Sequence, residues 1–189
     1  GITIAFAEAN GSRAFDYPYG VLIGCDPEEM QRFAPYQTVV LDAQYFTTAQ
    51  IATLHAAGHT VYSYLNIGSL ETFRPYYDRF AAYTRKLYEN WPDERWVDVA
   101  APAWVAFAGT ELANALRAKG IDGFFVDNCD VYDLYPQEAT LQALCEILRA
   151  LRVGDTPVIL NGGDGLVTEV AQREGDVTSI LTGVNQETV

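Results

Sequence analysis

The sequence contains few of the residues on which most metal and nucleophilic sites depend. Its 189 residues include only two histidines and three cysteines, and no two cysteines form a CxxC pair. Cys25, Cys129 and Cys145 therefore predict neither a zinc site nor a disulfide framework. Buried free thiols are expected instead, because an unpaired cysteine behaves as a small apolar residue.

The two histidines, His55 and His59, fall on and just after a predicted helix. We expect both near the face opposite the carboxyl ends of the strands, where they cannot serve as a catalytic base. A serine or cysteine hydrolase would then lack its base, and the chain has no GxSxG motif. Cys129 lies among acidic residues, and neighbouring negative charge makes a thiol a poorer nucleophile.

Positive charge and long apolar runs are also scarce. Twelve basic residues against 25 acidic ones give a formal net charge of -13. This balance argues against nucleic acid and anionic membranes as partners, and it suits a cationic substrate or serves solubility alone. No apolar run is long enough to span a bilayer. The 189 residues are enough for one domain, and the apolar content of 49% is enough for a sizeable core.

Strand-type and helix-type segments alternate about six times along the chain. The expected strands are residues 21–24, 38–41, 60–65, 157–160 and 178–184, together with a buried strand within residues 121–130 that ends in acids. Such regular alternation predicts a parallel sheet with right-handed crossovers, either a TIM-type barrel or an open doubly wound sheet. No GxGxxG or Walker-type loop follows the first strand, which weakens the nucleotide-binding version of the open sheet.

Polar residues recur where the predicted strands end. They are Asp42, Asn66, Asp127, Asn161 and Glu187. In a barrel these ends converge on one face, which is the face where such enzymes work. The predicted fold is therefore an α/β TIM-type (β/α) barrel with about six of its eight βα units visible. Either the N-terminal arm and a further segment supply the other strands, or the barrel is incomplete.

The predicted barrel domain covers residues 20–189 and follows an N-terminal arm, residues 1–19. Within the arm, residues 2–9 have either the character of an export-signal remnant or that of an edge strand, and the second interpretation is favoured slightly. An insertion at residues 69–101 is rich in tyrosine, tryptophan and arginine. Its aromatic side chains either stack on sugar rings or pack the loop against the barrel, and the sequence leaves both uses open.

Carboxylates, amides and tyrosines are the chemical groups left at the strand ends. Hydrolysis without metal or histidine is most familiar as glycoside cleavage, which requires two carboxyl groups across the scissile bond. Asp127 and Glu187 end two different strands, so a barrel would set them facing one another. Two alternatives remain. One is a metal-dependent hydrolase with Asp127, Asp130 and Asp133 as ligands, and the other is a polysaccharide-binding barrel without catalysis.

Four ordered blocks resemble the motifs of the endo-α-1,4-polygalactosaminidase family of glycoside hydrolases. The third strand and its extension carry Tyr64-Leu65-Asn66-Ile67-Gly68-Ser69-Leu70-Glu71, followed by Arg74-Pro75. The next block has Trp91-Pro92-x-Glu94-Arg95-Trp96-x-Asp98, and the fourth strand has Gly123-Phe124-Phe125-Val126-Asp127-Asn128-x-Asp130. Asn185-Gln186-Glu187 is similar to a later strand end of the family.

The resemblance implies endo-cleavage of an α-linked, galactosamine-containing exopolysaccharide by an exported enzyme. It also implies Asp127 and Glu187 as the catalytic pair, which we assign as nucleophile and acid/base of a retaining mechanism. No cofactor and no metal are expected, and the expected partner is the polysaccharide alone. The residues expected to bind the sugar are Asp42, Tyr64, Asn66, Glu71, Asn128, Asp130 and Asn161.

Overall fold

The computed structural model describes residues 15–87 and 92–187. The chain forms two compact units. One contains residues up to Tyr64 together with Ala115–Phe125, and the other contains Leu65–Asn114 together with the chain from Val126 onward. The predicted export-signal segment, residues 2–9, lies outside the described residues. No helix in the described ranges is both long enough and apolar enough to cross a membrane.

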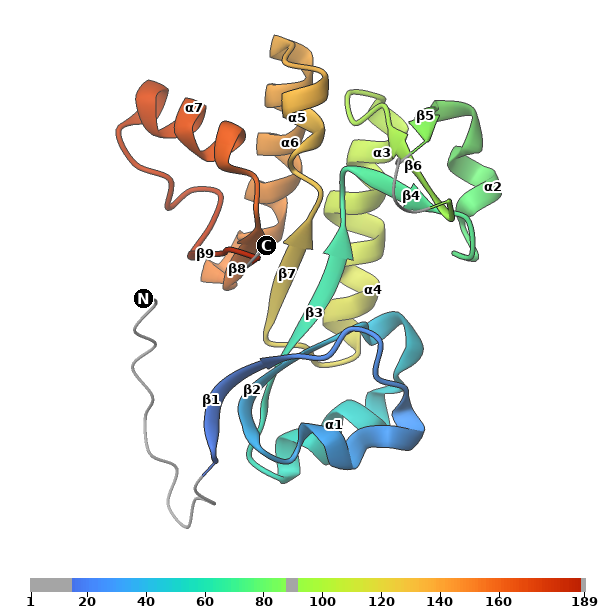
Figure 1. Cartoon of the computed structure of the whole chain (residues 1–189), viewed down its shortest axis with the longest axis vertical. Coiled ribbons are helices and arrows are strands. Elements are labelled where there is room, and N and C mark those ends of the chain that lie inside the picture. The colour runs from blue at the N-terminus through green and yellow to red at the C-terminus, as the bar shows by residue number, and fades with distance from the viewer. Residues whose placement is uncertain (1–14, 88–91, 188–189) are drawn as a thin grey trace. The chain divides into compact units, whose positions relative to one another are not determined.

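The first three strands pair in parallel (Figure 1). Strand β1 (Tyr17–Val21) pairs with β2 (Tyr36–Leu41), and β2 pairs with β3 (Thr60–Asn66). The middle strand ends in a continuous apolar run, Val39–Leu41, which is fully buried. Such runs are typical of parallel strands that are covered on both faces. The second and third predicted strands are thereby confirmed.

The first strand begins earlier than the sequence predicts. The expected strand at residues 21–24 is wrong, because β1 ends at Val21 and includes Pro18. Proline lowers the strand propensity of a segment, yet an edge strand tolerates it because one side of its backbone has no ladder partner. Strand β1 lies at the edge of its sheet. Its position is therefore set by pairing with β2 rather than by its own residue preferences.

Helices follow the first two strands in the chain. They are the 3₁₀ helix η1 (Pro27–Phe33), the short 3₁₀ turn η2 (Ala43–Tyr45) and helix α1 (Thr48–Ala56). Helix α1 begins with the predicted capping box. Gln50 N donates to Thr47 Oγ1 at 3.1 Å, and Thr47 N donates to Gln50 Oε1 at 2.9 Å. Gly58 follows the helix with φ +97°, a conformation that glycine adopts at little cost.

The six main strands are hydrogen-bonded in the order β1-β2-β3-β7-β8-β9, which follows the chain. The later strands are β7 (Gly123–Asp127), β8 (Val158–Asn161) and β9 (Gly183–Asn185), and β8 and β9 are parallel. A doubly wound sheet reverses its strand order at a switch point, whereas neighbouring strands of a (β/α) barrel follow one another in sequence. The observed order favours the barrel prediction.

Strand β9 is shorter than the predicted strand at residues 178–184. Its first expected residues form a turn, in which the backbone N–H and the hydroxyl of Thr178 both donate to Asp176 Oδ1 at 2.8 Å. A side chain that satisfies nearby backbone groups in this way competes with strand pairing. The strand therefore begins only at Gly183.

The aromatic insertion folds into a second, antiparallel sheet. Its strands are β4 (Ser69–Glu71), β5 (Thr84–Leu87) and β6 (Glu94–Val97), in the order β4-β6-β5, with helix α2 (Tyr77–Phe80) and the 3₁₀ turn η3 (Ala81–Tyr83). Figure 1 shows these elements grouped together in green. Phe80 packs against Trp104 and Phe107, with ring centroids 5.3 Å and 4.7 Å away. At least part of the aromatic content therefore serves packing.

The remaining helices belong mainly to the second unit. They are α3 (Pro102–Ala106), the π-helical turn Phe107–Leu112, α4 (Ala113–Ala118), α5 (Val131–Leu134), α6 (Glu138–Leu151) and α7 (Asp164–Glu174), with a 3₁₀ turn at Val153–Asp155. The leucine periodicity predicts α6, and its leucines are buried as expected. Gly109 lies against α6, where a Cβ atom would approach Ala150 Cβ to 3.3 Å.

The cysteines and histidines lie as the sequence predicts. All three cysteines are buried free thiols. His55 Nε2 lies 2.8 Å from Asp122 Oδ2, and Asp122 precedes strand β7 at its amino end. His59 is buried, with Nδ1 2.7 Å from the carbonyl oxygen of Tyr36. Both histidines therefore serve structural contacts in the first unit.

Candidate functional site

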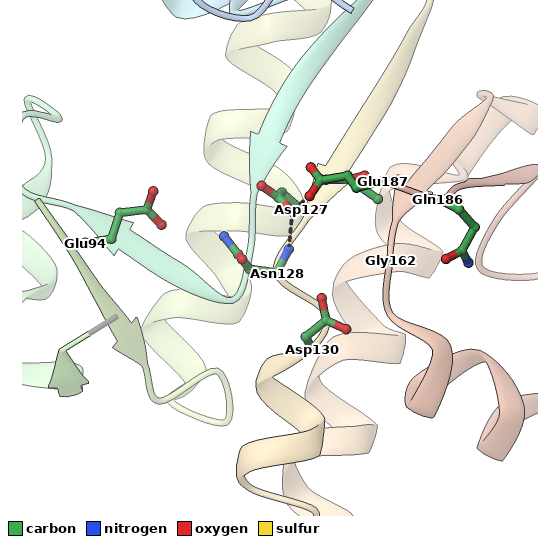
Figure 2. Close-up of a pocket in the computed structure, with 8 residues that line it drawn as sticks. Glu94, Asp127, Asn128, Asp130, Gly162, Gln186 and Glu187 are labelled. Carbon is green, nitrogen blue, oxygen red and sulfur yellow. Dashed lines mark hydrogen bonds between the residues drawn. The ribbon is translucent and has the colours of Figure 1, made fainter. Parts of the chain in front are cut away.

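A pocket of about 330 Å³ lies in the second unit, at the carboxyl ends of β7 and β8 (Figure 2). Its lining is almost wholly polar and consists of Glu94, Asp127, Asn128, Asp130, Asn161, Gly162, Gln186 and Glu187. Asp127 is the last residue of β7 and Asn161 the last of β8, while Glu187 follows β9. Side chains at the ends of buried parallel strands have no packing role, so they are available for chemistry.

The amide of Asn161 joins the two acids expected to form the catalytic pair. Its Nδ2 atom donates to Asp127 Oδ1 at 3.2 Å and to Glu187 Oε1 at 2.9 Å, and Figure 2 shows Asp127 beside Glu187. The sum of these two distances, 6.1 Å, is an upper limit for the separation of the two carboxylate oxygens. One amide group therefore holds both acids at one point of the pocket.

The orientation of this amide is fixed from the other side. Asn185 Nδ2 donates to Asn161 Oδ1 at 2.8 Å, so the oxygen of Asn161 faces Asn185 and its nitrogen faces the acids. The two asparagines are register partners in the β8–β9 pair. The parallel pairing of two short strands thus determines which end of the Asn161 side chain meets the carboxylates.

Asp127 receives a further hydrogen bond from its own chain. Asn128 has left-handed backbone dihedrals with φ 69°, and its N–H donates to Asp127 Oδ1 at 2.9 Å. Asparagine tolerates this conformation better than most residues. Two N–H donors to one carboxylate oxygen stabilise the ionised form of an aspartate. The residue following β7 therefore helps to keep Asp127 charged.

A third acid, Glu94, reaches the pocket from strand β6 of the small sheet. The hydroxyl of Ser69 on β4 donates to Glu94 Oε2 at 2.7 Å. Burial raises the pKa of Glu94 above its usual value, the Ser69 hydrogen bond lowers it, and the charges of Glu71 and Asp127 raise it further. Glu94 is therefore a half-buried carboxyl group with an increased tendency to hold a proton.

Asp130 also lines the pocket, on the side of Asn128 that is away from Asp127 (Figure 2). Its Oδ1 atom accepts a hydrogen bond of 3.0 Å from the N–H of Gly163, and burial raises the pKa of this carboxyl group. Gly162 has φ +72°, and a Cβ atom there would lie 3.0 Å from Asp130 Oδ2. The glycine-rich turn after β8 therefore allows the backbone to approach Asp130 closely.

The sequence profile of glycoside-hydrolase family GH114 matches residues 7–152. The chain belongs to this family. The match includes Glu94 and Asp127 and ends before Asn161 and Glu187. The family that the sequence motifs resemble is thereby confirmed, and so is the enzyme class, a glycoside hydrolase. No curated protein sequence matches this GH114 chain.

Several solved structures share the fold of this GH114 chain. The glycoside hydrolase domain of PelA from Pseudomonas aeruginosa is 22% identical, with a TM-score of 0.70 over 92% of this chain and 67% of that one. Ega3 from Aspergillus fumigatus, solved in complex with galactosamine, is 20% identical, with a TM-score of 0.68 over 89% and 67%. The α-galactosidase TtGalA from Thermus thermophilus is 10% identical, with a TM-score of 0.60 over 79% and 38%. These likenesses confirm the predicted fold, an α/β TIM-type barrel that is incomplete over this length.

The expected site residues of the GH114 chain fall into two groups. Asp127, Glu187, Asn128, Asp130 and Asn161 line the pocket. The others are buried among protein groups. Asp42 caps η2 by accepting from Gln44 N, Tyr64 is 7% exposed, Asn66 bonds to Ser69, and Glu71 pairs with Arg74 Nη2 at 2.6 Å.

The sequence prediction missed three residues of the pocket, Glu94, Gly162 and Gln186. Gln186 Nε2 donates to Asp164 Oδ1 at 2.9 Å, which fixes the rim beside Glu187. Glu94 begins a strand of the insertion and does not end a strand of the main sheet, so it is not part of the pattern of polar strand ends. Its place in the block Glu94-Arg95-Trp96 was the available signal.

The geometry gives no support to the alternative of a metal site at Asp127, Asp130 and Asp133. Within residues 15–87 and 92–187, no group of three or more histidine, cysteine, aspartate or glutamate side chains is placed to hold a metal ion. Asp133 points elsewhere, because a Cβ atom at Gly165 would lie 2.0 Å from its Oδ1 atom, and it does not line the pocket.

Proposed function

We propose that this chain is a retaining endo-glycosidase that cleaves an α-linked, galactosamine-containing polysaccharide, with Asp127 and Glu187 as the catalytic pair. The observation that carries the proposal is the shared amide of Asn161. It limits the separation of Asp127 Oδ1 and Glu187 Oε1, one oxygen of each carboxyl group, to 6.1 Å, from distances of 3.2 Å and 2.9 Å. Retaining enzymes have their carboxyl groups about 5–5.5 Å apart, whereas inverting enzymes need about 6.5–9.5 Å to admit a water.

The surroundings of the two acids support their separate roles. Asp127 is half-buried, and its Oδ1 atom accepts from Asn128 N and Asn161 Nδ2, as suits a nucleophile that must stay ionised. Glu187 is exposed at the rim, where it can reach both the departing sugar and the incoming water. We therefore assign Asp127 as the nucleophile and Glu187 as the acid/base.

Two observations support the choice of substrate. Ega3, which shares the fold, was solved with galactosamine, and four of the eight residues that line the present pocket are carboxylic acids. An acidic pocket attracts a sugar polymer that carries free amino groups. The enzyme would act outside the cytoplasm, as the family resemblance of its sequence implies.

The expected sugar-binding residues take different parts in this proposal. Asp130 contacts the sugar from the pocket wall, while Asn128 and Asn161 position the acids. Asn66 and Glu71 act through the buried contacts behind the pocket. Asp42 and Tyr64 remain predictions from the sequence.

The test compares the variants Asp127→Asn and Glu187→Gln with Glu146→Gln, which removes the same charge from the exposed surface of α6. Release of reducing ends from a de-N-acetylated galactosamine polymer is measured. Each site variant is expected to lose about a thousandfold in kcat while binding is kept, and the control is expected to match the wild type. Full activity of either site variant would refute the assigned pair.

Two further measurements separate the remaining alternatives. NMR of the first product gives its anomeric configuration, and an inverted product would rule out the retaining mechanism. A chelator such as EDTA is expected to leave activity unchanged, whereas a metal-dependent hydrolase would lose it. A polysaccharide-binding barrel would release no reducing ends at all, even from the wild-type protein.

A further inference from the structure

A buried network behind the pocket has a single possible orientation. The N–H of Ser69 donates to Asn66 Oδ1 at 3.1 Å, which identifies the oxygen end of that amide. Asn66 Nδ2 then donates to Ser69 Oγ at 2.7 Å. Asn128 Nδ2 donates to Asn66 Oδ1 at 2.9 Å and to Ser69 Oγ at 3.1 Å. Because Ser69 Oγ accepts two hydrogen bonds, its one hydrogen is left for Glu94.

This orientation decides what Glu94 offers to the pocket. Its Oε2 atom accepts the hydroxyl hydrogen of Ser69 at 2.7 Å, the Asn66 side chain also donates to this carboxylate, and Glu94 lines the pocket. Figure 2 shows the carboxyl group of Glu94 on the side that faces Asp127 and Asn128. Glu94 is thus a fixed hydrogen-bond acceptor opposite the proposed nucleophile.

The charges around Glu94 favour a cation as its ligand. Glu71 on β4 and Asp127 on β7 are the acids whose charges act on it, and Arg74 is engaged by Glu71 at 2.6 Å. None of the described residues that line the pocket is basic. Burial of a carboxylate among like charges is costly, and a bound ammonium group offsets that cost.

We propose that Glu94 is a specificity-determining residue whose carboxylate binds a protonated amino group of the sugar, and that Ser69 positions it. The inference rests on the proposed function, because it takes the amino-sugar polymer as the ligand. Asp127 and Glu187 are engaged in the reaction itself. Asp130 already accepts from Gly163 N and lies against Gly162. The carboxyl group of Glu94 faces Asp127 (Figure 2), so we assign the amino group to Glu94 rather than to Asp130.

The test measures binding in the full chain carrying Asp127→Asn, so that the ligand stays uncut. The two probes are a galactosamine oligosaccharide and its N-acetylated counterpart, each titrated by calorimetry. Adding Glu94→Gln is expected to weaken the free-amine ligand about tenfold and the N-acetylated ligand less than twofold. Glutamine still accepts the Ser69 hydrogen, so the buried network is kept. Adding Glu146→Gln to the same background controls for the lost charge.

Ser69→Ala tests the positioning role through the pH dependence of binding. Loss of the Ser69 donor raises the pKa of Glu94 further. As the pH is lowered, Glu94 in Ser69→Ala should therefore become protonated, and lose affinity for the free amine, at a higher pH than in the protein with serine. Glu94→Asp keeps the charge but shortens the side chain by one methylene. The preference for the free-amine ligand over the N-acetylated ligand should therefore be kept in part. A thermal melt shows whether each variant is folded.

An unchanged preference for the free amine in folded Glu94→Gln would overturn the inference. If Asp127→Asn is inactive at the same time, the proposed catalytic pair stands and only the role of Glu94 fails. If Asp127→Asn cleaves the polymer normally, the proposed function fails, and the inference fails with it.

Discussion

Gly68 lies so close to Asn128 that a Cβ atom at position 68 would be 1.8 Å from the Asn128 carbonyl oxygen. The neighbouring backbone cannot move away easily. Asn128 has φ 69°, and its side chain is fixed by two hydrogen bonds to Asn66 and Ser69. Position 68 is therefore restricted to glycine by a contact with the segment that carries Asp127.

Gly68→Ala should destabilise the protein by about 3 kcal/mol or more, because the inserted methyl group meets backbone rather than a flexible side chain. Urea unfolding measures the change in free energy of unfolding. The matched control is Gly24→Ala, since a Cβ atom at Gly24 meets nothing within 4 Å. Equal stability of the two variants would show that the Gly68 contact does not constrain the fold.

Asn161→Asp should lower kcat about a hundredfold, because the shared donor to Asp127 and Glu187 is replaced by a third negative charge. Loss of the donor and the added charge both favour protonated carboxyl groups. The acid limb of the pH–rate profile should therefore move to higher pH.

The control for Asn161→Asp is Asn114→Asp on the exposed surface of α4, which should leave both kcat and the profile unchanged. A merely structural role for Asn161 would reduce the amount of folded enzyme without moving the pH–rate profile. That outcome would contradict the positioning role.

Arg173→Gln should lower the melting temperature at pH 7. The difference in melting temperature from the wild type should become smaller as the pH falls. Arg173 binds both carboxylate oxygens of Glu138, at 2.7 Å and 2.8 Å, and lowers the pKa of Glu138 to about 2. A lowered folded-state pKa adds stability above the unfolded-state value, and that stability is lost as Glu138 becomes protonated.

The difference between wild type and Arg173→Gln should therefore narrow between about pH 5 and pH 2. High salt should narrow it too, because the ion pair is exposed. Arg32→Gln serves as the control, since Arg32 pairs with Glu29 in the same short helix, at 3.1 Å. A pH-independent difference would mean that Arg173 acts through packing alone.

The fold is predictable from the sequence wherever the local residue pattern of a segment determines its secondary structure. The capping box at Thr47 and the leucine periodicity of α6 each specify a helix, and the structure contains both. Strands β1 and β9 were misplaced, because pairing and a side-chain turn set their limits. Tyr17 N bonds to the carbonyl oxygen of Pro35, and Asp176 holds Thr178 out of the strand. Neither contact can be inferred from the local residue pattern.

The site is predictable where chemistry coincides with the end of a main strand, as at Asp127 and Asn161. Glu94 needs different information. It reaches the pocket because β4 pairs with β6, which places Ser69 and Glu94 on neighbouring strands separated by 25 positions in sequence. Asn161 was expected to contact sugar, but in the folded protein its amide nitrogen donates to two acids.

The two sheets contribute different members of the pocket. Asp127 and Asn161 come from the six-stranded sheet, whereas Glu94 comes from the three-stranded sheet of the insertion. The bond-breaking groups and the proposed amine-selecting group are therefore encoded in separate stretches of the gene. Exchanging the insertion among homologous enzymes would offer a route to new sugar preferences that leaves the catalytic acids in place.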